Sequence, residues 1–247
     1  MKRVVILGAT KGMGRALARV LAERGDQLFV LGREPEELKR TVADLEARSR
    51  EVSTVGHAVC DLADTASFAP ALEAAAARLG GIDVVVVSAA MFALQDALEA
   101  DIELCERLVH VNFSATIVFC EQARKQLLAT GGGTLCVFSS VAGDRGRKPV
   151  AIYGACKAGL SHYLESLDHK YREAGLNTVC VKPGFVKTGM TAGLKPPPFA
   201  GEPEQVALGV SKAIDRGTPV FYTPPMWRWV MLVIRNLPRA AMRRVGF

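Results

Sequence analysis

The sequence predicts an α/β protein built on a single doubly wound parallel sheet of about seven strands. Helices are expected on both faces, with an amphipathic extension at the C-terminus. Two observations favour this fold class. Short apolar runs alternate with amphipathic helical runs along the whole chain. One run, IDVVVVSAA, is almost continuously apolar, as a strand covered on both faces should be.

The first half of the chain supplies four strand and helix pairs. The expected strands cover residues 3–8, 28–33, 51–62 and 82–90, and the expected helices cover residues 14–25, 35–49, 64–81 and about 98–128. Gly25 is a typical stop signal for the first helix, and Pro35 suits the first turn of the second. The fourth helical run is the longest and is expected to be continuous.

The second half continues the alternation. Strands are expected over residues 133–140, 177–183 and 218–224, and helices over 150–175 and 202–217. A proline cluster, LKPPPFAGEP, separates the sixth strand from the following helix. A loop of this length at such a junction is more often a lid than a domain boundary. We call residues Leu194 to Pro203 the lid loop.

The charge and the lengths of the apolar runs argue against several classes of protein. The 247 residues carry a formal net charge of +6, and five arginines after residue 225 supply most of it. The remaining body is nearly neutral, which argues against a nucleic-acid partner. The N-terminal apolar run is too short for a signal peptide, and no run approaches the ~20 apolar residues of a membrane span. We therefore expect a cytoplasmic protein, either free or peripheral at the inner face of the membrane.

The six cysteines are scattered along the chain and form no C-x-x-C pair. Cysteines of this kind in a cytosolic protein are typically small, buried and reduced. Ligand spacing for zinc is absent. We expect no metal site and no disulfide.

A glycine-rich turn follows the first strand. In the run GATKGMG, Gly8, Gly12 and Gly14 lead into the first helix. The unpaired backbone amides and the helix dipole there favour an anion, and small residues let a pyrophosphate approach. An ordinary strand–helix turn is the alternative. The glycine run, however, follows the first strand of an alternating chain, and this position favours a dinucleotide site of the Rossmann type.

The end of the second strand indicates which dinucleotide is bound. NAD-binding proteins usually carry an acid here that accepts hydrogen bonds from the ribose 2′-hydroxyl. This chain has Gly32 and Arg33 instead, and Lys11 lies in the glycine loop. Two cations and no acid suit a 2′-phosphate, so NADP(H) is favoured over NAD(H), unless both cations are solvated surface charges. Asp61 ends the third strand, where it can meet the adenine edge, cap the next helix, or do both.

The run SSVAGDRGRKPVAIYGACKAG holds the catalytic candidates. Tyr153 and Lys157 are four residues apart and share a helix face, and Ser140 precedes Tyr153 by thirteen residues at a strand end. A free tyrosine has a pKa near 10, so proton exchange near neutrality needs a fall of up to about three units, roughly 4 kcal/mol. A lysine ammonium one turn away can supply part of this, and a serine hydroxyl can hold a substrate oxygen. A chance surface pair is the alternative, which the glycine loop and strand order disfavour.

From Val4 to about Tyr222 the chain resembles the short-chain dehydrogenase/reductase family. GATKGMG matches its cofactor loop, YGACK its Tyr-x-x-x-Lys, VNFSA its central asparagine at Asn112, and KPGFVKTGM its Pro-Gly segment. The family's N-N-A-G after the fourth strand is replaced by Val-Ser-Ala-Ala, a departure that concerns sheet stability and backbone contacts. The resemblance implies a cofactor site of Gly8, Thr10, Lys11, Gly12, Met13, Gly14, Arg33, Asp61, Leu62, Ser88, Ala89, Tyr153, Lys157, Pro183, Gly184, Val186 and Thr188.

The resemblance also implies hydride transfer between a nicotinamide and a carbonyl or secondary-alcohol carbon. In reduction, Tyr153 would donate the proton, and Lys157 would bind the ribose and lower the pKa of the tyrosine. Ser140 would polarise the carbonyl, and Asn112 would support a relay water near the lysine. The cofactor carries the hydride, while the protein supplies orientation and electrostatics. A non-catalytic NADP(H)-sensing protein on the same fold would show a broken triad, and this triad is intact.

Basic residues follow two strands on the expected substrate side of the sheet. GDRGRKP offers Arg145, Arg147 and Lys148, and FVKTGMTAGLKPPP offers Lys187 and Lys195. These cations are expected either to serve solubility or to bind an anionic group of the substrate, such as a phosphate.

The C-terminal half resembles one subgroup of the family, the decaprenylphosphoryl-2-keto-ribose (2-keto-erythro-pentose) reductases. The similarity is carried by AGDRGRKPVAIYGACKAGL and by the ending WRWVMLVIRNLPR. It implies a small-molecule or lipid-linked ketone or alcohol, such as a ketosugar on a polyprenyl phosphate. Three alternatives remain open: a 3-ketoacyl-type reductase, a 3-ketosphinganine-type reductase, and a membrane-surface scaffold, which would need the tail but not Tyr153.

Residues 225–247 are expected to form a basic amphipathic segment after a main domain of residues 1–224. At about 100° per residue, Arg228, Arg235 and Arg239 share one stripe. The opposite side gathers Trp227, Val230, Met231, Ile234 and Leu237. Pro238 should kink or end the helix. We expect residues 226–244 to lie at a membrane surface, where tryptophan and arginine are favoured; the alternative is packing on the body or on a partner subunit.

The family usually pairs the long helices that are expected near residues 98–128 and 153–174. The resemblance therefore implies a homodimer or a homotetramer.

Overall fold

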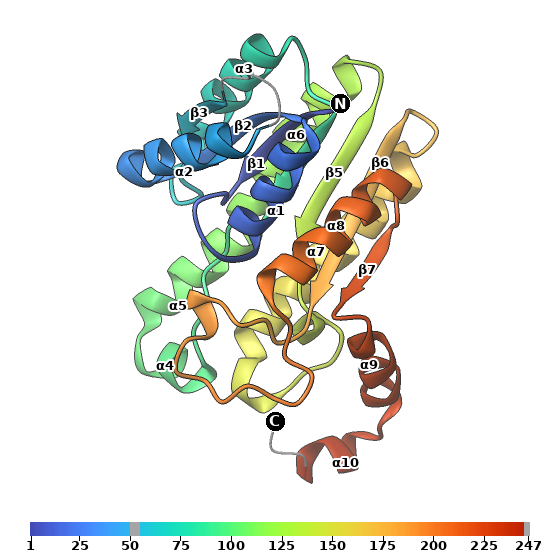
Figure 1. Cartoon of the computed structure of the whole chain (residues 1–247). Helices are drawn as coiled ribbons and strands as arrows, with labels where there is room; N and C mark the ends of the chain where they lie inside the picture. The colour runs from blue at the N-terminus through green and yellow to red at the C-terminus, as the bar shows by residue number, and fades with distance from the viewer. Residues whose placement is uncertain (50–54, 245–247) are drawn as a thin grey trace.

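The computed structural model describes residues 1–49 and 55–244. They form one sheet of seven parallel strands in the order β3-β2-β1-β4-β5-β6-β7 (Figure 1), which confirms the predicted fold class. The strands are β1 (Arg3–Leu7), β2 (Gln27–Gly32), β3 (Gly56–Val59), β4 (Val84–Val87), β5 (Gly133–Phe138), β6 (Leu176–Pro183) and β7 (Val220–Thr223).

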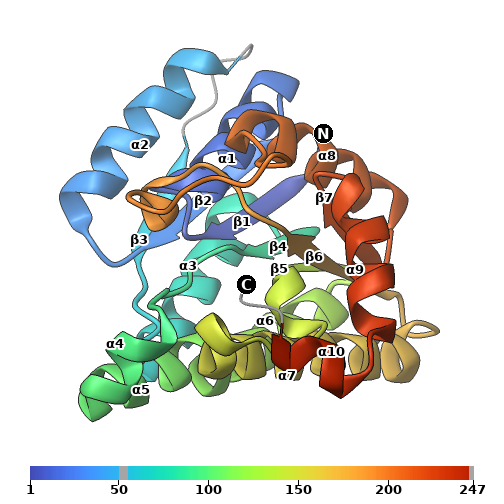
Figure 2. The ribbon, with the colours of Figure 1, turned by 90° about the horizontal axis from the view of Figure 1, so that it is seen from below.

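Helices cover both faces of the sheet (Figure 2). One apolar core joins the sheet to α1 (Gly12–Arg24), α2 (Pro35–Arg48) and α8 (Pro203–Arg216). The other joins it to α3 (Phe68–Leu79), α6 (Ala115–Ala129) and α7 (Ala151–Tyr171). The four valines of β4 are all buried, since this central strand contributes side chains to both cores. The continuous apolar run is therefore explained by burial on two sides.

Most predicted elements are found within a few residues of their expected ends. Gly25 ends α1 with a φ of +90°, and Pro35 opens α2. The third strand is shorter than expected, because β3 begins at Gly56 and ends at Val59. Part of the predicted strand, residues 51–54, lies outside the described residues.

The predicted long helix over residues 98–128 is wrong as a single element. The chain forms α4 (Gln95–Ala100), α5 (Ile102–Val109), a π-helical turn (His110–Ser114) and then α6. Asp101 separates the first two helices, and its carboxylate accepts a hydrogen bond from the amide of Leu104 at 2.9 Å. This is an N-cap, so a new helix starts at a residue that the hydrophobic pattern runs straight through.

The C-terminal segment forms α9 (Met226–Asn236) and α10 (Arg239–Arg244), with Pro238 between them as predicted. The expected apolar face does not point to solvent. Met231 and Ile234 are 0% and 6% exposed and pack with Val141, so this face belongs to the body. The membrane interpretation of this face is therefore wrong, and the packing alternative holds for it.

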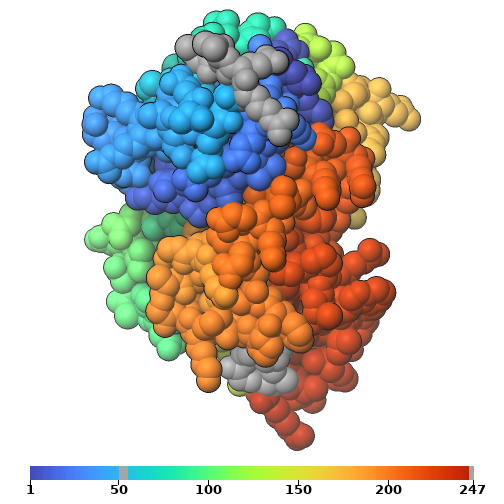
Figure 3. All heavy atoms as spheres, viewed as in Figure 1, coloured from blue at the N-terminus to red at the C-terminus, as the bar shows by residue number. Residues whose placement is uncertain are grey.

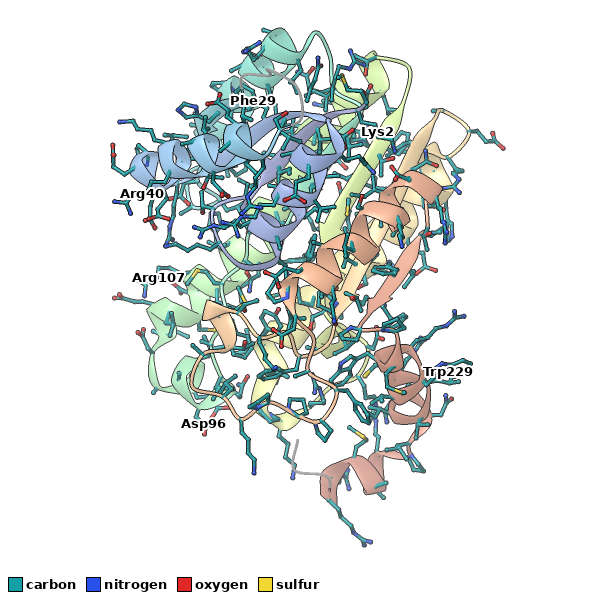
Figure 4. All side chains as sticks on the ribbon, in the orientation of Figure 1. Lys2, Phe29, Arg40, Asp96, Arg107 and Trp229 are labelled. Carbon is teal, nitrogen blue, oxygen red and sulfur yellow. The ribbon has the colours of Figure 1, made fainter. Side chains whose placement is uncertain are left out.

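A second apolar face of α9 is exposed. Trp229, Leu232 and Val233 are 62%, 53% and 63% exposed, and Trp229 lies on the outer side of α9 in Figure 4. Among the described residues, no helix is long and apolar enough to cross a membrane.

Candidate active site

Two cavities lie at the carboxyl ends of the strands, the lower end of the sheet in Figure 1. The first, of about 500 Å³, is lined by Gly8, Thr10, Lys11, Arg33, Asp61, Leu62, Ser88 and Ala89 from the predicted cofactor set. The second, of about 560 Å³, is lined by Met13, Ser140, Tyr153, Pro183, Gly184, Val186 and Thr188. Met190 lines both cavities, so the predicted cofactor and catalytic residues form one continuous region. We call these the cofactor cavity and the catalytic cavity.

Two glycines of the loop, Gly8 and Gly14, leave no room for a side chain. Gly8 has a φ of +95°, and a Cβ there would come within 2.5 Å of the backbone nitrogen of Ala89. A Cβ at Gly14 would lie 2.2 Å from the Gly8 carbonyl oxygen. The nearest contact of a Cβ at Gly12 would be Thr188, at 3.6 Å, which brings the loops after β1 and β6 together.

Ser88 ties the end of β4 to the glycine loop. Its hydroxyl donates to the carbonyl oxygens of Leu7 at 3.1 Å and Gly8 at 3.2 Å. The pairing of Leu7 with Val87 in neighbouring strands brings these groups side by side. Ser88 thus supplies a connection at the place where the sequence departs from the family's N-N-A-G.

An acid lies just after the end of β2. It is Glu34, one residue after Arg33. Glu34 lines the cofactor cavity, and its carboxylate lies 3.9 Å from Lys11 Nζ and 3.5 Å from Arg33 Nε. The expectation of two cations and no acid is therefore wrong. All three side chains are at least half exposed, so these ion pairs are weak and an incoming phosphate can replace them.

Asp61 lines the cofactor cavity and also caps a turn. Its Oδ1 accepts a hydrogen bond from the amide of Ala63 at 2.9 Å. The following short helix is capped by Asp64, which accepts from Ala66 at 3.1 Å. Arg107 and His110, which no sequence motif indicated, also line this cavity, from α5 and the π-helical turn. Figure 4 marks Arg107 at this side of the molecule.

Tyr153 and Lys157 lie one turn apart on α7, and Ser140 follows β5. Tyr153 is 9% exposed, and its ring packs edge-on against Phe92 with centroids 5.1 Å apart. The Lys157 ammonium lies 5.7 Å from the centroid of the Tyr153 ring. It donates a hydrogen bond to the carbonyl oxygen of Phe138 at 2.8 Å. Lys157 is therefore held against the end of β5, just below the tyrosine ring.

Burial controls the protonation of this pair. Burial raises the pKa of Tyr153 to about 12, while a hydrogen bond with Ser140 and the charge of Arg147 act in the opposite direction. Burial also lowers the pKa of Lys157 to about 8. The expected fall of the tyrosine pKa is therefore not found in the protein alone, since desolvation of the phenolate outweighs both favourable groups.

Asn112 lies in the π-helical turn and is 1% exposed. Its Oδ1 accepts from the amide of Met91 at 2.7 Å, and its Nδ2 donates to the carbonyl of Met91 at 2.8 Å. Both ends of the amide are thus used to hold the chain after β4. The side chain fastens a wall of the cofactor cavity and is not directed at Lys157.

Comparison with known proteins agrees with this geometry. Residues 2–198 match the family model of the short chain dehydrogenases. The chain is also 31% identical over 242 residues to an uncharacterized oxidoreductase of Mycobacterium tuberculosis, covering 98% of this chain and 96% of the relative. The chain is a member of the short-chain dehydrogenase family. It is an NAD(P)-dependent oxidoreductase.

Solved short-chain dehydrogenases share the fold. A short-chain dehydrogenase/reductase from Mycobacterium ulcerans superposes with a TM-score of 0.82 at 22% identity, covering 89% of this chain and 87% of the other. A variant of the actinorhodin polyketide ketoreductase, solved with NADPH, gives a TM-score of 0.79 at 23% identity, covering 90% and 95%. These similarities support the architecture of this dehydrogenase.

The C-terminal segment of this dehydrogenase is a wall of the catalytic cavity. Trp227, Val230 and Ile234 of α9 line it together with Leu194, Lys195 and Pro197 of the lid loop. Figure 3 shows the lid loop and α9 next to each other on the surface. A Cβ at Gly184 would lie 2.1 Å from the indole of Trp227, so the Pro-Gly segment allows α9 to approach closely.

The basic residues proposed for an anionic substrate group occupy different places. Arg147 lines the catalytic cavity, as does Lys195. Arg145 instead donates to the carbonyl of Leu237 at 2.7 Å, and Lys148 donates to the carbonyl of Arg243 at 2.7 Å. Lys187 pairs with Glu202 at 2.5 Å. Of the five predicted anion-binding residues, Arg147 and Lys195 are thus the two that line the catalytic cavity.

A buried network fixes the loop that carries these cations. Asp144, whose side chain is 3% exposed, accepts hydrogen bonds from Lys182 at 2.6 Å and from the Tyr222 hydroxyl at 2.7 Å. The acid next to Arg145 is therefore directed toward β6 and β7.

All six cysteines are free, and five of them are buried. Within residues 1–49 and 55–244, no three His, Cys, Asp or Glu side chains are grouped as a metal site would require.

Proposed function

We propose that this dehydrogenase reduces the keto group of a large, mostly apolar substrate with NADP(H). The observation that carries the proposal is the composition of the catalytic cavity. Tyr153 and Ser140 lie in a cavity whose walls are apolar side chains from three separate parts of the chain. These walls include Met13, Phe92, Leu94, Val150, Leu194, Trp227, Val230 and Ile234. A pocket of this kind suits a long or bulky ketone better than a small polar one.

The protonation state of Tyr153 supports reduction. With a pKa near 12, the phenol is protonated at neutral pH and can donate a proton to a carbonyl oxygen. Ser140, which shares a hydrogen bond with the phenol, would hold the same oxygen. A bound nicotinamide supplies the hydride, and the protein supplies the proton and the orientation.

Lys157 and Asn112 have supporting roles in this proposal. The lysine has two further N–H donors beyond the bond to Phe138, and these can meet the ribose of the cofactor. Its positive charge close to Tyr153 favours the phenolate that forms as the proton leaves. Asn112 positions the segment around Met91, so any relay role would have to use its backbone.

The preference for NADP(H) rests on Lys11 and Arg33. Both cations lie at the rim of the cofactor cavity, and both are held by the single exposed carboxylate of Glu34. A 2′-phosphate carries more charge than that carboxylate and can take both cations. Arg107, on the wall of the same cavity, adds a third positive charge.

The substrate class that we propose is a lipid-linked or long-chain ketone, for example a ketosugar on a polyprenyl phosphate. The resemblance of the C-terminal half to reductases of such ketosugars supports this choice. The structure adds a physical reason, because the resembling segment supplies the wall of α9. Segments that line a pocket decide which substrates fit it.

We also propose peripheral membrane contact through the outer face of α9. Met226, Trp229, Leu232 and Val233 are exposed there, and Arg228 is exposed beside them. Apolar side chains flanked by arginine favour the surface of an anionic bilayer. Because α9 also forms the cavity wall, substitution of Trp229 and Leu232 by serine is a cleaner test than deletion. Loss of sedimentation with anionic vesicles while NADPH binding remains supports the proposal, and a full-length protein that ignores vesicles contradicts it.

A homodimer or homotetramer is part of the same proposal. Ile102, Val109 and Val118 on α5 and α6 are 70%, 38% and 41% exposed. Burial between two copies would remove this apolar area from water. A mass measured by light scattering that equals one chain would contradict the assembly.

The reaction is tested by NADPH oxidation with a panel of ketones that differ in length. Tyr153→Phe keeps the ring and removes the proton donor, so turnover should fall at least a hundredfold while NADPH still binds. Tyr171→Phe is the matched control, because Tyr171 lies on the same helix and outside both cavities. Retention of more than about a tenth of the activity in Tyr153→Phe would overturn the assignment.

A further inference from the structure

A third cavity lies between the loop at residues 145–148 and α10. It measures about 370 Å³ and is lined by Arg145, Gly146, Lys148, Arg239, Met242 and Arg243. Four of these six residues are cations and none is an acid. Within the part of the chain that the structure describes, none of the four cations has a carboxylate partner within 4.0 Å.

The groups that compensate these charges are backbone carbonyls. Arg145 donates to Leu237 and Lys148 donates to Arg243, one hydrogen bond each. A guanidinium has five N–H donors and an ammonium has three, so both side chains keep donors for a ligand. Asp144, the acid nearest in sequence, is engaged with Lys182 and Tyr222. The cavity therefore concentrates positive charge that an anion would stabilise.

This cavity and the catalytic cavity are lined by adjacent parts of the same two segments. On one side, Arg147 and Pro149 line the catalytic cavity, and consecutive residues lie about 3.8 Å apart. On the other side, α9 lines the catalytic cavity with Ile234, and α10 follows after Pro238. Figure 1 shows α9 and α10 one after the other at the lower end of the molecule. The four cations therefore lie on segments that continue from the walls of the catalytic cavity.

We propose that this cavity binds a phosphate group of the substrate while the keto group of the same molecule reaches Tyr153. The proposal rests on the proposed function, since it presupposes a ketone in the catalytic cavity. Arg239 and Arg243 are four residues apart on α10 and line the same cavity. Two guanidinium groups and two further cations suit a phosphate, which offers several oxygens and up to two negative charges, better than a carboxylate.

The first test measures binding of phenyl phosphate by calorimetry to the full-length protein with NADP⁺ bound, so that the glycine loop is occupied. The variant is Arg239→Gln with Arg243→Gln. The matched control is Arg216→Gln with Arg228→Gln, which removes the same charge from two exposed arginines outside this cavity. The Kd of the first variant should rise about tenfold or more, and that of the control should change less than twofold.

The second test separates a substrate phosphate from a lipid headgroup and from failure of the proposed function. Two ketones of equal length are compared, one ending in a phosphate ester and one in a hydroxyl. In the Arg239→Gln, Arg243→Gln variant, the KM of the phosphate ester should rise about tenfold, and the KM of the hydroxyl ketone should stay unchanged. If neither ketone is reduced by the wild type, the proposed function fails, while the phenyl phosphate result still decides the anion site.

Two results would overturn the proposal. One is equal weakening of phenyl phosphate binding in the variant and in the control, which would indicate a general field of the basic tail. The other is a variant that binds phenyl phosphate normally and loses only its affinity for vesicles of phosphatidic acid. That outcome would assign the four cations to a membrane surface.

Discussion

Trp227 of α9 donates a hydrogen bond from Nε1 to the carbonyl oxygen of Phe199 in the lid loop, over 3.3 Å. This contact joins two walls of the catalytic cavity that are far apart in the sequence. The base of the lid loop is held on its other side, where Gly201 donates to Phe185 at 2.9 Å. The indole therefore links the C-terminal helix to the lid loop, which also lines the catalytic cavity.

Trp227→Phe should weaken the binding of long ketones and leave the cofactor unaffected. The substitution keeps an aromatic ring against Gly184 and removes the hydrogen bond to Phe199, worth about 1 kcal/mol. We expect KM for a long ketone to rise about fivefold, with KM for NADPH unchanged. Steady-state kinetics with one long and one short ketone checks this. Trp229→Phe is the control, because Trp229 is exposed on the outer face of α9; an equal effect in both variants would contradict a role in the cavity.

Glu34→Gln should strengthen NADPH binding. The carboxylate of Glu34 lies against both Lys11 and Arg33, so a 2′-phosphate must displace it from them. These groups are well exposed, so we expect a modest gain, about two- to fivefold in Kd for NADPH. Fluorescence titration with NADPH and NADH measures both affinities, and Glu36→Gln on the exposed side of α2 is the control. A loss of NADH affinity with NADPH unchanged would instead assign Glu34 to a ribose 2′-hydroxyl and favour NAD(H).

The fold and the central residues of the site could be predicted from sequence because they follow short-range rules. Strand and helix periodicity, Gly25 as a helix stop and the spacing of Tyr153 from Lys157 need no knowledge of distant contacts. The break at Asp101 could not be predicted, because α5 continues the hydrophobic pattern and the cap depends on where the chain turns.

The directions in which the cationic side chains point could not be predicted from the sequence. Arg145, Arg147 and Lys148 lie within four residues and have similar side chains, yet Arg147 lines the catalytic cavity while the other two hold the C-terminal segment. The sheet-facing Asp144 fixes this arrangement through Lys182, which lies 38 residues away. The same holds for the C-terminal segment. Helix α9 has two apolar faces, and the sequence does not show which of them packs against Val141.

Arg147→Gln should move the pH profile of alcohol oxidation to higher pH. Oxidation needs the phenolate of Tyr153, and the charge of Arg147 favours that form by lowering the pKa of the tyrosine. Without this charge the pKa rises, so the oxidation profile should shift upward. Reduction, which needs the protonated phenol, should not lose rate near neutral pH. Rates measured from pH 6 to 10 test this, with Lys195→Gln as the control cation of the same cavity; identical shifts in the two variants would contradict the pairing.

The contribution of Lys157 to the stability of the protein should grow between pH 8 and pH 10. Burial lowers the pKa of this lysine from 10.5 to about 8. Below pH 8 the lysine is charged in both states, and the folded protein bears the cost of a buried cation. Between pH 8 and 10.5 the folded state is neutral while the unfolded state still binds a proton, so the free energy of unfolding increases with pH. The full difference corresponds to about 3 kcal/mol.

Tyr153 and the buried cysteines act in the opposite direction, because burial raises the pKa of each of these groups. The pKa of Tyr153 is raised from 10 to about 12, so above pH 10 the folded state retains a proton that the unfolded state loses, and this group lowers the stability. Urea denaturation at pH 7, 8, 9 and 10 should therefore show the free energy of unfolding of the wild type increasing relative to that of Lys157→Met. The absolute stability of Lys157→Met is less informative, because the carbonyl of Phe138 loses its donor at every pH. Lys39→Met, at an exposed position on α2, is the matched control. A difference between wild type and Lys157→Met that stays constant from pH 7 to pH 10 would show that the buried lysine does not titrate in this range.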